Sequence, residues 1–430
     1  MVGNSLLDQK KFLRDLFDRA VEVADPMRSL AVHLPAKPTR GAGRLVVIGA
    51  GKASARMAEA VEASWGPCEG LVITRYGYGR PCQGIEIVEA SHPVPDAAGQ
   101  AATERMLDLL DGLGAQDMVL ALISGGASSL LVAPCDGITL EEKQNVNKAL
   151  LASGAPIDRM NTLRKHLSRV KGGQLAARAH PAPMHCLMIS DVPGDDPAFI
   201  GSGPTVGDPS TPQDALEVLQ RWRIDAPRSV IEALGRGSGV VAPEDPRLRT
   251  VTNVIYAAPA QSLEAAAQLA RARIAGLDVR MLGDALEGEA REIAAHHAQL
   301  ARDIQSQLTP DGAPVLLLSG GELTVTRRGD GIGGPNAEYC LALAMALDGA
   351  AGIHALACDT DGVDGAAEVA GAVVSPRTID KARVTHLDPQ EALARNDAHS
   401  FFKAIGDQVL TGPTLTNVND FKAILIEAKV

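Results

Sequence analysis

Short apolar runs alternate with amphipathic stretches along most of the chain. Strands are expected at 45–48, 70–74, 85–89, 118–123 and 184–189. Helices are expected at 5–32, 53–63, 97–113, 140–153 and 161–171, the last with a possible extension past 172–173. Most strand segments are continuously apolar, which is typical of parallel strands buried on both faces. The alternation predicts an α/β fold with a large, Rossmann-like, mostly parallel sheet covered by helices.

A second, smaller α/β domain is expected toward the C-terminus. Helices are predicted at 262–275 and 289–307, and strands at 315–318, 354–357 and 421–426. The segment 235–249 is rich in glycine, proline and charge, which is typical of a linker. Single cores stop growing at about 250–300 residues, so a chain of 430 residues favours two domains. We place them at 1–240 and 241–430.

Composition narrows the class of partner. The net charge of −11 and the aromatic content of 3% argue against nucleic acid, which requires a basic surface and stacking platforms. No apolar run approaches the ~20 residues of a membrane helix, and the charged N-terminus lacks the apolar core of a signal peptide. Six scattered cysteines form no C-x-x-C pair. We expect a soluble, cytoplasmic enzyme with a small-molecule substrate; an exposed sheet edge could support a homodimer.

Three apolar runs end in glycine-rich turns. They are Gly49-Ala50-Gly51-Lys52, Ser124-Gly125-Gly126 and Ser319-Gly320-Gly321. Such a turn lets backbone N–H groups approach an anion at the carboxyl edge of a sheet. Lys52 would begin the next helix, where a cation opposes the helix dipole unless an anion lies between them. The alternative is that Lys52 points to solvent.

The first turn matches neither common nucleotide motif. Val46 occupies the position of the first glycine of a P-loop, and Ser54 the last position of a dinucleotide fingerprint. The acidic residue that would bind a ribose is absent as well. Arg75 ends the next strand and could suit a 2′-phosphate, so NADPH remains an alternative.

Residues 161–171 form the only dense basic stretch of this acidic chain. Arg164, Ser168 and Lys171 form a polar stripe along the predicted helix, parallel to the apolar stripe of Leu163, Leu167 and Val170. Basic runs are usually solvated faces. Here the acidic background favours a site for a carboxylate or phosphate.

Two acidic clusters follow predicted strands. Asp191, Asp195 and Asp196 follow the strand at 184–189, and Asp359, Asp361 and Asp364 follow the strand at 354–357. An aspartate at the carboxyl end of a strand is well placed as a base or a magnesium ligand. Capping or Asx turns are the alternative.

Eight segments in order resemble the glycerate 2-kinase family built from an N-terminal α/β domain and a C-terminal MOFRL domain. They read VVIGAGKASARMAEAVE, SHPVPDAAG, LISGGASSLL, MNTLRKHLSRVKGGQLA, ISDVPGDDPAFIGSGPT, LLSGGELTV, CDTDGVDG and TGPTLTNVND. The resemblance implies phosphorylation of D-glycerate at its 2-hydroxyl by ATP and Mg²⁺, in a cleft between the domains, to give 2-phosphoglycerate and ADP.

On the matching positions, the resemblance implies three catalytic residues: Lys52, Asp191 as the base, and Arg164 on the carboxylate or phosphate. Lys165 and Asn161 would bind the substrate. The nucleotide would be bound by Gly49, Gly51, Ser124, Gly125, Gly126, Ser128, Ser319, Gly320, Gly321, Glu322 and Asn336. The metal would be held by Asp191, Asp195, Asp359 and Asp361.

One segment departs from the family pattern. Many members read GGRNQE where this chain reads GGPNAE, so Pro335 stands at the position of the family's arginine. Arg327 or Arg328 would have to take over the role of that arginine. GGPNAE resembles the branch labelled hydroxypyruvate reductase in tartrate degradation. The alternative function is therefore an NAD(P)H-dependent hydroxypyruvate reductase with His92 or His166 as proton donor.

Overall fold

The computed structural model describes residues 8–39, 41, 43–365 and 367–429. It divides into an N-terminal unit, Pro26–Tyr256, and a C-terminal unit, in which the segment ending at Asp25 joins everything from Ala257 onward. In the described part of the chain no helix is long and apolar enough to cross a membrane.

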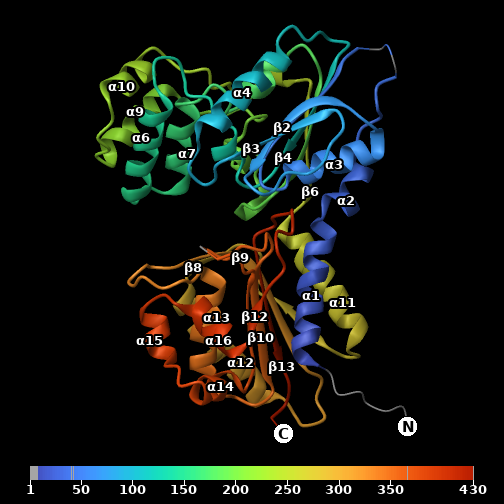
Figure 1. Ribbon diagram of the computed structural model, residues 1–430, viewed down its shortest axis with the longest axis vertical. Helices are drawn as coiled ribbons and strands as arrows, with labels where there is room; N and C mark the ends of the chain where they lie inside the picture. The colour runs from blue at the N-terminus through green and yellow to red at the C-terminus, as the bar shows by residue number, and fades with distance from the viewer. Residues whose placement is uncertain (1–7, 40, 42, 366, 430) are drawn as a thin grey trace. The chain divides into compact units, whose positions relative to one another are not determined.

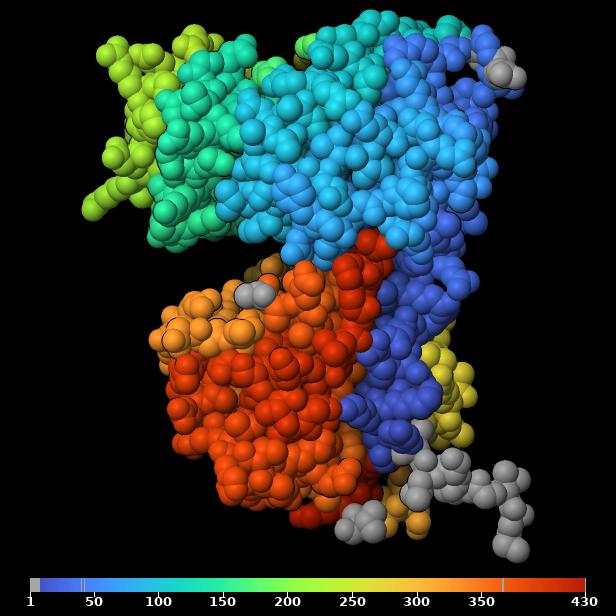
Figure 2. Space-filling model, viewed as in Figure 1, coloured from blue at the N-terminus to red at the C-terminus, as the bar shows by residue number. Residues whose placement is uncertain are grey.

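The division differs from the expected boundary at 240/241 for two reasons. Strand β6 (Val251–Ala257) is added to the sheet of the N-terminal unit, beyond the expected linker. Helix α1 (Gln9–Ala24) packs against α11 (Pro259–Arg273), so it belongs to the C-terminal unit. Figure 2 shows the blue residues of α1 against the yellow and red residues of that unit.

The sheet of the N-terminal unit has the order β3-β2-β1-β4-β5-β6. Its strands, besides β6, are β1 (Leu45–Ala50), β2 (Glu69–Arg75), β3 (Ile85–Ala90), β4 (Met118–Ile123) and β5 (Met184–Ile189). The pairs from β3 to β5 are all parallel, which confirms the predicted parallel sheet. The strand order reverses between β1 and β4, and ligands of open α/β sheets bind outside the carboxyl ends of strands at such a point.

Helices cover this sheet and form an additional layer. Helix α3 (Ser54–Trp65) contacts β1, β2 and β4, while α4 (Ala97–Leu110) and α8 (Gln174–Ala179) share a hydrophobic cluster with the strands. A separate cluster joins α6 (Leu140–Ala152), α7 (Ile157–His166), α9 (Pro212–Arg221) and α10 (Arg228–Gly235) (Figure 1).

Helix α7 ends at His166, five residues before the end predicted from its periodicity. The backbone of the following residues bonds to a distant segment instead. Ser168 forms an antiparallel bridge with Pro134, and the Arg169 N–H donates to the Ala133 carbonyl at 3.0 Å. Gly172 and Gly173 then adopt positive φ, which ends any continuation of the helix.

The C-terminal unit has a mixed sheet in the order β12-β11-β10-β13-β9-β7, with β8 beside β9. Its strands are β7 (Asp278–Met281), β8 (Leu286–Glu289), β9 (Val315–Thr324), β10 (Ile353–Asp359), β11 (Gly371–Val374), β12 (Gln408–Val409) and β13 (Asp420–Ile426). β13 is antiparallel to both β9 and β10. Helices α1 and α11 lie side by side along one face (Figure 1).

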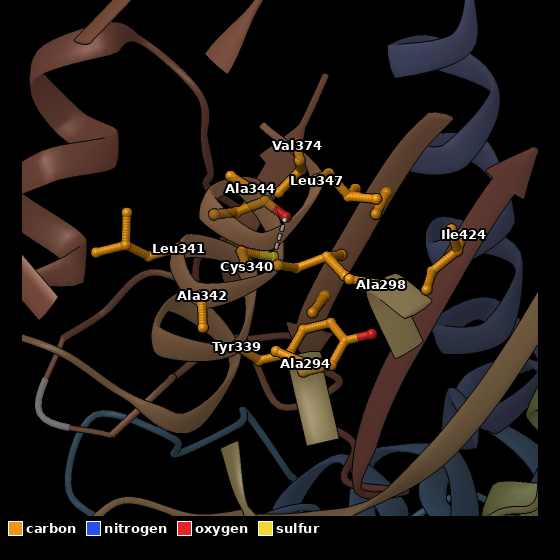
Figure 3. Packing of buried hydrophobic residues seen from close by; sticks show 14 of the residues in the cluster. Ala294, Ala298, Tyr339, Cys340, Leu341, Ala342, Ala344, Leu347, Val374 and Ile424 are labelled. Atoms are coloured by element: carbon orange, nitrogen blue, oxygen red, sulfur yellow. Dashed lines mark hydrogen bonds between the residues drawn. The ribbon is translucent and has the colours of Figure 1, made fainter. Parts of the chain in front are cut away.

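The opposite face is covered by α12 (Ala290–Gln307) and α13 (Pro335–Leu347), whose alanines allow close packing (Figure 3). The Cys340 thiol donates to the Ala372 carbonyl at 3.3 Å, and the Tyr339 hydroxyl lies 2.8 Å from His297 Nδ1.

The remaining helices are α2 (Pro26–Ser29), α5 (Ala127–Leu130), α14 (Thr378–Val384), α15 (Pro389–Ala394), α16 (Ala398–Ile405) and the 3-10 turns Leu30–His33, Pro193–Asp195, Ile200–Ser202 and Pro246–Leu248.

The second Ser-Gly-Gly is not a turn. Ser319, Gly320 and Gly321 lie within β9, which continues to Thr324 and pairs with β13 and β8. Gly321 has φ +113, and a Cβ there would lie 2.2 Å from both the N and the O of Leu286. The glycine therefore serves the close approach of β8, and the predicted anion-binding turn at this position is wrong.

We expect Gly321→Ala to destabilise the C-terminal unit by more than about 2 kcal/mol, since a left-handed backbone alone costs about 1–2 kcal/mol and the collision adds to it. Gly276→Ala is the matched control, because its φ is +78 but its nearest neighbour is a side-chain atom at 3.7 Å. Urea-induced unfolding measures both variants. Equal losses in the free energy of unfolding of the two variants would show that the close approach of β8 is not the reason for a glycine at position 321.

Candidate functional site

The loops after β1 and β4 are bound to each other at the carboxyl ends of the two central strands. The Lys52 N–H donates to the Gly125 carbonyl at 2.8 Å. The buried Ser124 hydroxyl accepts from the Ala53 N–H at 3.1 Å and lies 3.1 Å from the Ser54 hydroxyl. These contacts hold Lys52 at the point where the strand order reverses.

Two glycines, Gly49 at the end of β1 and Gly51 in the loop that follows, are required by the close approach of β1 and β4 and of their loops. A Cβ at Gly49 would lie 2.5 Å from the Leu122 carbonyl oxygen, and a Cβ at Gly51 would lie 2.1 Å from Ser124 Oγ. Either distance is far inside van der Waals contact. Close packing of β1 against β4 at Gly49, and of the loop after β1 against the loop after β4 at Gly51, accounts for both glycines without a ligand.

The backbone of the first turn is also occupied. The N–H groups of Gly51, Lys52, Ala53 and Ser54 donate to Ile73 O, Gly125 O, Ser124 Oγ and Gly51 O. The expectation that this turn offers its N–H groups to an anion is therefore wrong. Any anion held here has to be met by side chains.

Gly126 allows the side chains of two candidate site residues, Lys52 and His92, to converge. It has φ +82, and a Cβ there would lie 3.3 Å from Lys52 Cγ and 3.1 Å from His92 Nε2. His92 follows β3, so the loops after three strands contribute to this position.

A cavity of about 210 Å³ opens beside Gly126, lined by the loops after β3 and β4 and by α6 and α7. Its charged lining residues are Lys143, Arg164 and Lys171. Among the described residues that line it there is no Asp or Glu. The other lining residues are His92, Pro93, Pro95, Gly126, Ser128, Ser129, Val132, Gln144, Val146, Asn147, Leu150, Leu163 and Leu167.

The three cations have neutral partners. Lys143 Nζ donates to the Leu167 carbonyl, and Lys171 Nζ donates to the carbonyls of Ser128 at 2.7 Å and Leu131 at 3.3 Å. Arg164 Nε donates to Asn147 Oδ1 at 2.8 Å. Over the described ranges no carboxylate forms an ion pair with any of the three.

Burial affects the ionisation of these groups. Lys143 and Lys171 are only 9% and 1% exposed. Burial, with a smaller effect of Arg164, lowers the pKa of Lys143 to about 8. Burial first, and then the neighbouring cations Lys143, Arg164 and Lys165, hold the pKa of Lys171 well below its usual value. An anion in the cavity would raise the pKa of both lysines, because a nearby opposite charge favours the ammonium form.

The segment after β5 reaches the same edge. The hydroxyls of Ser128 and Ser202 lie 2.8 Å apart. Asp191 lies two residues after the end of β5 and is half-buried. Asp195 has φ +52 and a buried oxygen, Oδ1, without a hydrogen-bond partner among the described residues. The first acidic cluster therefore belongs to the N-terminal unit, at the carboxyl edge of its sheet.

Arg164 and Lys165 do not face the same site. Lys165 forms an ion pair with Asp208 and, with Asn161, lines a separate depression that also contains Asp158. Consecutive residues of a helix point in different directions, so only one can enter the cavity. His166 also lies outside it, because its ring nitrogens contact the hydroxyls of Ser238 and Ser210.

In the C-terminal unit, Asp364 serves the start of α13. Its carboxylate accepts from the Asn336 and Ala337 N–H groups at 2.9 and 2.8 Å. Asn336 Nδ2 donates to Asp420 at 2.6 Å, and Lys422 pairs with Asp420 at 2.8 Å. Burial raises the pKa of Asp420. This network anchors the helix that begins at Pro335.

The other predicted residues of this unit lie in turns and in β9. The Asp361 N–H donates to Asp359 Oδ1 at 2.9 Å, and the Val363 N–H donates to Asp361 Oδ1 at 2.8 Å, which are Asx turns. Glu322 is an exposed residue of β9. Arg327 and Arg328 are exposed in the segment that follows β9. Among the residues described, no three His, Cys, Asp or Glu side chains are arranged to hold a metal ion.

Lys143 is the residue that sequence reasoning missed. It lies in phase with Val146 and Leu150, the two buried apolar residues of α6. A lysine on the apolar side of an amphipathic helix was the available signal, since such a group is rarely buried without a reason.

We expect Lys143→Met to stabilise the ligand-free protein at pH 7 by about 1–3 kcal/mol, because a buried cation is replaced by an apolar group. The Leu167 carbonyl keeps a donor, the Cys135 N–H at 3.3 Å. The folded-state pKa is about 8, below the unfolded value, so the penalty is complete below pH 8 and is relieved as pH rises toward 10.5.

Urea-induced unfolding of both proteins at pH 7 and pH 9.5 measures this effect. The advantage of the variant should shrink at the higher pH. A variant less stable than the wild type at pH 7 would show that Lys143 is not under electrostatic strain. Lys148→Met, on the exposed side of the same helix, is the control and should change little at either pH.

Comparison with known proteins agrees with this architecture. The family model described as "Domain of unknown function (DUF4147)" matches residues 12–235, and the model of the MOFRL family matches residues 315–420. The crystal structure of glycerate kinase from Thermotoga maritima has a TM-score of 0.86 and 37% identity, covering 97% of this chain and 99% of that one.

Two curated relatives match nearly the whole chain. A protein of Agrobacterium vitis named "Putative hydroxypyruvate reductase" is 51% identical over 97% of this chain and 94% of its own length. The "D-glycerate 2-kinase" of Thermotoga maritima is 37% identical over 96% of this chain and 97% of its own length. The order of the domains, the fold and the identity over the full length show that the chain belongs to the glycerate 2-kinase family, in which a DUF4147 domain precedes a MOFRL domain.

Proposed function

We propose that the protein transfers the γ-phosphoryl group of ATP to the 2-hydroxyl of D-glycerate, forming 2-phosphoglycerate and ADP. The observation that carries the proposal is the cavity beside Lys52 that is lined by three cations and by no carboxylate within the described residues. Phosphoryl transfer depends mainly on positioning and on positive charge around the moving group. Relatives named glycerate kinase support the same reaction.

The size of the cavity favours a small acid. Pockets for drug-sized ligands occupy about 300–1,000 Å³, whereas this cavity occupies about 210 Å³. It suits a three-carbon acid, with the nucleotide outside it. Arg164 would bind the carboxylate through its terminal nitrogens, since its Nε is held by Asn147.

Lys52 and Asp191 would act on the reacting atoms. The Lys52 side chain lies against Gly126, at the edge of the cavity, so its ammonium could reach the phosphoryl group that develops charge. Asp191 follows β5 at the same sheet edge, where a carboxylate can orient the 2-hydroxyl and accept its proton.

The acidic residues of the N-terminal unit suit a magnesium ion. Mg²⁺ is usually held by one or two carboxylates together with phosphate and water, and Asp195 Oδ1 is a buried carboxylate oxygen without a hydrogen-bond partner in the described chain. When bound, the ion would neutralise charge on the phosphates. Asp195 and Asp191 would hold it. Asp359 and Asp361 remain second candidates, because their carboxylates already accept turn N–H groups.

A second candidate function is NAD(P)H-dependent reduction of hydroxypyruvate. The name "Putative hydroxypyruvate reductase" of the Agrobacterium vitis relative and the position of His92 in the cavity favour it. The occupied N–H groups of Gly51 to Ser54 count against it, because a dinucleotide loop has to present such groups to a pyrophosphate.

Paired assays on the purified protein separate the two functions. We expect ADP formation that requires D-glycerate, with 2-phosphoglycerate as the product, and no oxidation of NADH or NADPH by hydroxypyruvate. ADP is followed with a coupled enzyme and the product by mass spectrometry. Oxidation of the nicotinamide without formation of ADP would reject the kinase and favour His92 as the proton donor.

Replacing the Lys52 side chain should remove most turnover. Loss of one group that stabilises transition-state charge costs about 10²- to 10³-fold in kcat, so we expect Lys52→Ala to lose at least about 100-fold in kcat with its unfolding curve unchanged. Lys148→Ala is the control, because its side chain is exposed on α6. Turnover of Lys52→Ala close to that of the wild type would remove Lys52 from the mechanism.

A further inference from the structure

The cavity contains more positive charge than the fold neutralises. Elsewhere in the basic stretch the cations have acidic partners, since Lys165 pairs with Asp208 and Arg169 with Glu104. Lys143, Arg164 and Lys171 donate only to carbonyl or amide oxygens among the described residues. Buried ions without a counter-charge are costly, so their arrangement around one cavity indicates a ligand that supplies the charge.

We propose that Lys143, Arg164 and Lys171 form a receptor for the carboxylates of a small 2-hydroxy acid, and that this receptor binds the acid without nucleotide. The inference rests on the proposed function for the identity of the acid, and it assigns two residues, Lys143 and Lys171, to the substrate site. It also predicts that dicarboxylates bind there better than glycerate.

The free donors match this ligand. An ammonium group has three N–H donors, and Lys143 uses one of them on Leu167 while Lys171 uses two on Ser128 and Leu131. The guanidinium of Arg164 uses Nε and leaves its two terminal nitrogens, the edge that binds a carboxylate through two parallel hydrogen bonds. Donors from three segments therefore remain for an anion in the cavity.

The rest of the lining limits the size of the acid and strengthens its binding. Val132, Val146, Leu150, Leu163 and Leu167 supply an apolar wall. Apolar walls exclude water and lower the local dielectric, so each charge contact is stronger than at the surface. They offer no partner to a long polar chain, which favours a three-carbon acid.

The count of charges determines the order of affinity. Glycerate carries one negative charge and balances one of the three cations, whereas hydroxymalonate has the same three-carbon skeleton and carries two. Glycerol has similar hydroxyl groups and no charge. The receptor should therefore bind hydroxymalonate more tightly than D-glycerate, and glycerol not measurably.

Isothermal titration without ATP tests the receptor, with hydroxymalonate, D-glycerate and glycerol as probes. We expect Lys143→Met to raise the Kd of hydroxymalonate by about 10- to 100-fold, the effect of losing one hydrogen bond between charged groups. Lys148→Met is the matched control, because it removes an exposed lysine of the same helix, and should keep the wild-type Kd. Arg164→Gln is the second variant, should Lys143→Met fail to fold.

The outcomes separate the receptor from the kinase. Hydroxymalonate binding that is lost in Lys143→Met or Arg164→Gln and kept in Lys148→Met supports the receptor, even if the wild type forms no glycerate-dependent ADP. A wild type that binds hydroxymalonate no better than glycerol overturns it. So does a Lys143→Met variant that keeps the wild-type Kd for hydroxymalonate, and this outcome can be read whether or not the kinase activity is present.

Discussion

The close approach of the loops after β1 and β4 is the constraint on which the N-terminal site depends. Ser124 lies so near Gly51 that no side chain fits between them, and its hydroxyl holds the Ala53 N–H. The same contact occupies the Lys52 and Ala53 N–H groups and leaves the Lys52 side chain beside Gly126. The glycine-rich turn is therefore explained by packing, and in the proposed site the positive charge for an anion comes from side chains.

The cavity next to this contact lowers the stability of the fold, because it buries lysines that have no counter-charge among the described residues. Its lysines are buried, and burial lowers their pKa because the fold supplies carbonyl oxygens where a carboxylate would have neutralised them. A protein selected only for stability would pair or replace such groups. Residues that lower stability in this way are typical of functional sites.

The C-terminal unit uses its charged residues differently. Asp364 and Asp420 are buried, and each accepts a hydrogen bond from Asn336, so the start of α13 is held by a network of polar groups. Pro335 fits the first position of that helix, where no N–H is needed. The departure from the family's arginine is thus compatible with the local fold, and it leaves the cations of the N-terminal unit as the charges of the proposed site.

Local sequence determined the parallel sheet, the limits of most strands and the family, because apolar runs and glycine turns are short-range patterns. Tertiary structure decided the rest. Helix α7 stops where Ser168 bonds to Pro134, and Ser319 to Gly321 remain in a strand because β8 and β13 pair with them. Lys143, Lys171 and Arg164 line one cavity, whereas Lys165 forms an ion pair with Asp208. The direction and the burial of each side chain depend on how distant segments pack, and not on the spacing of residues along the chain.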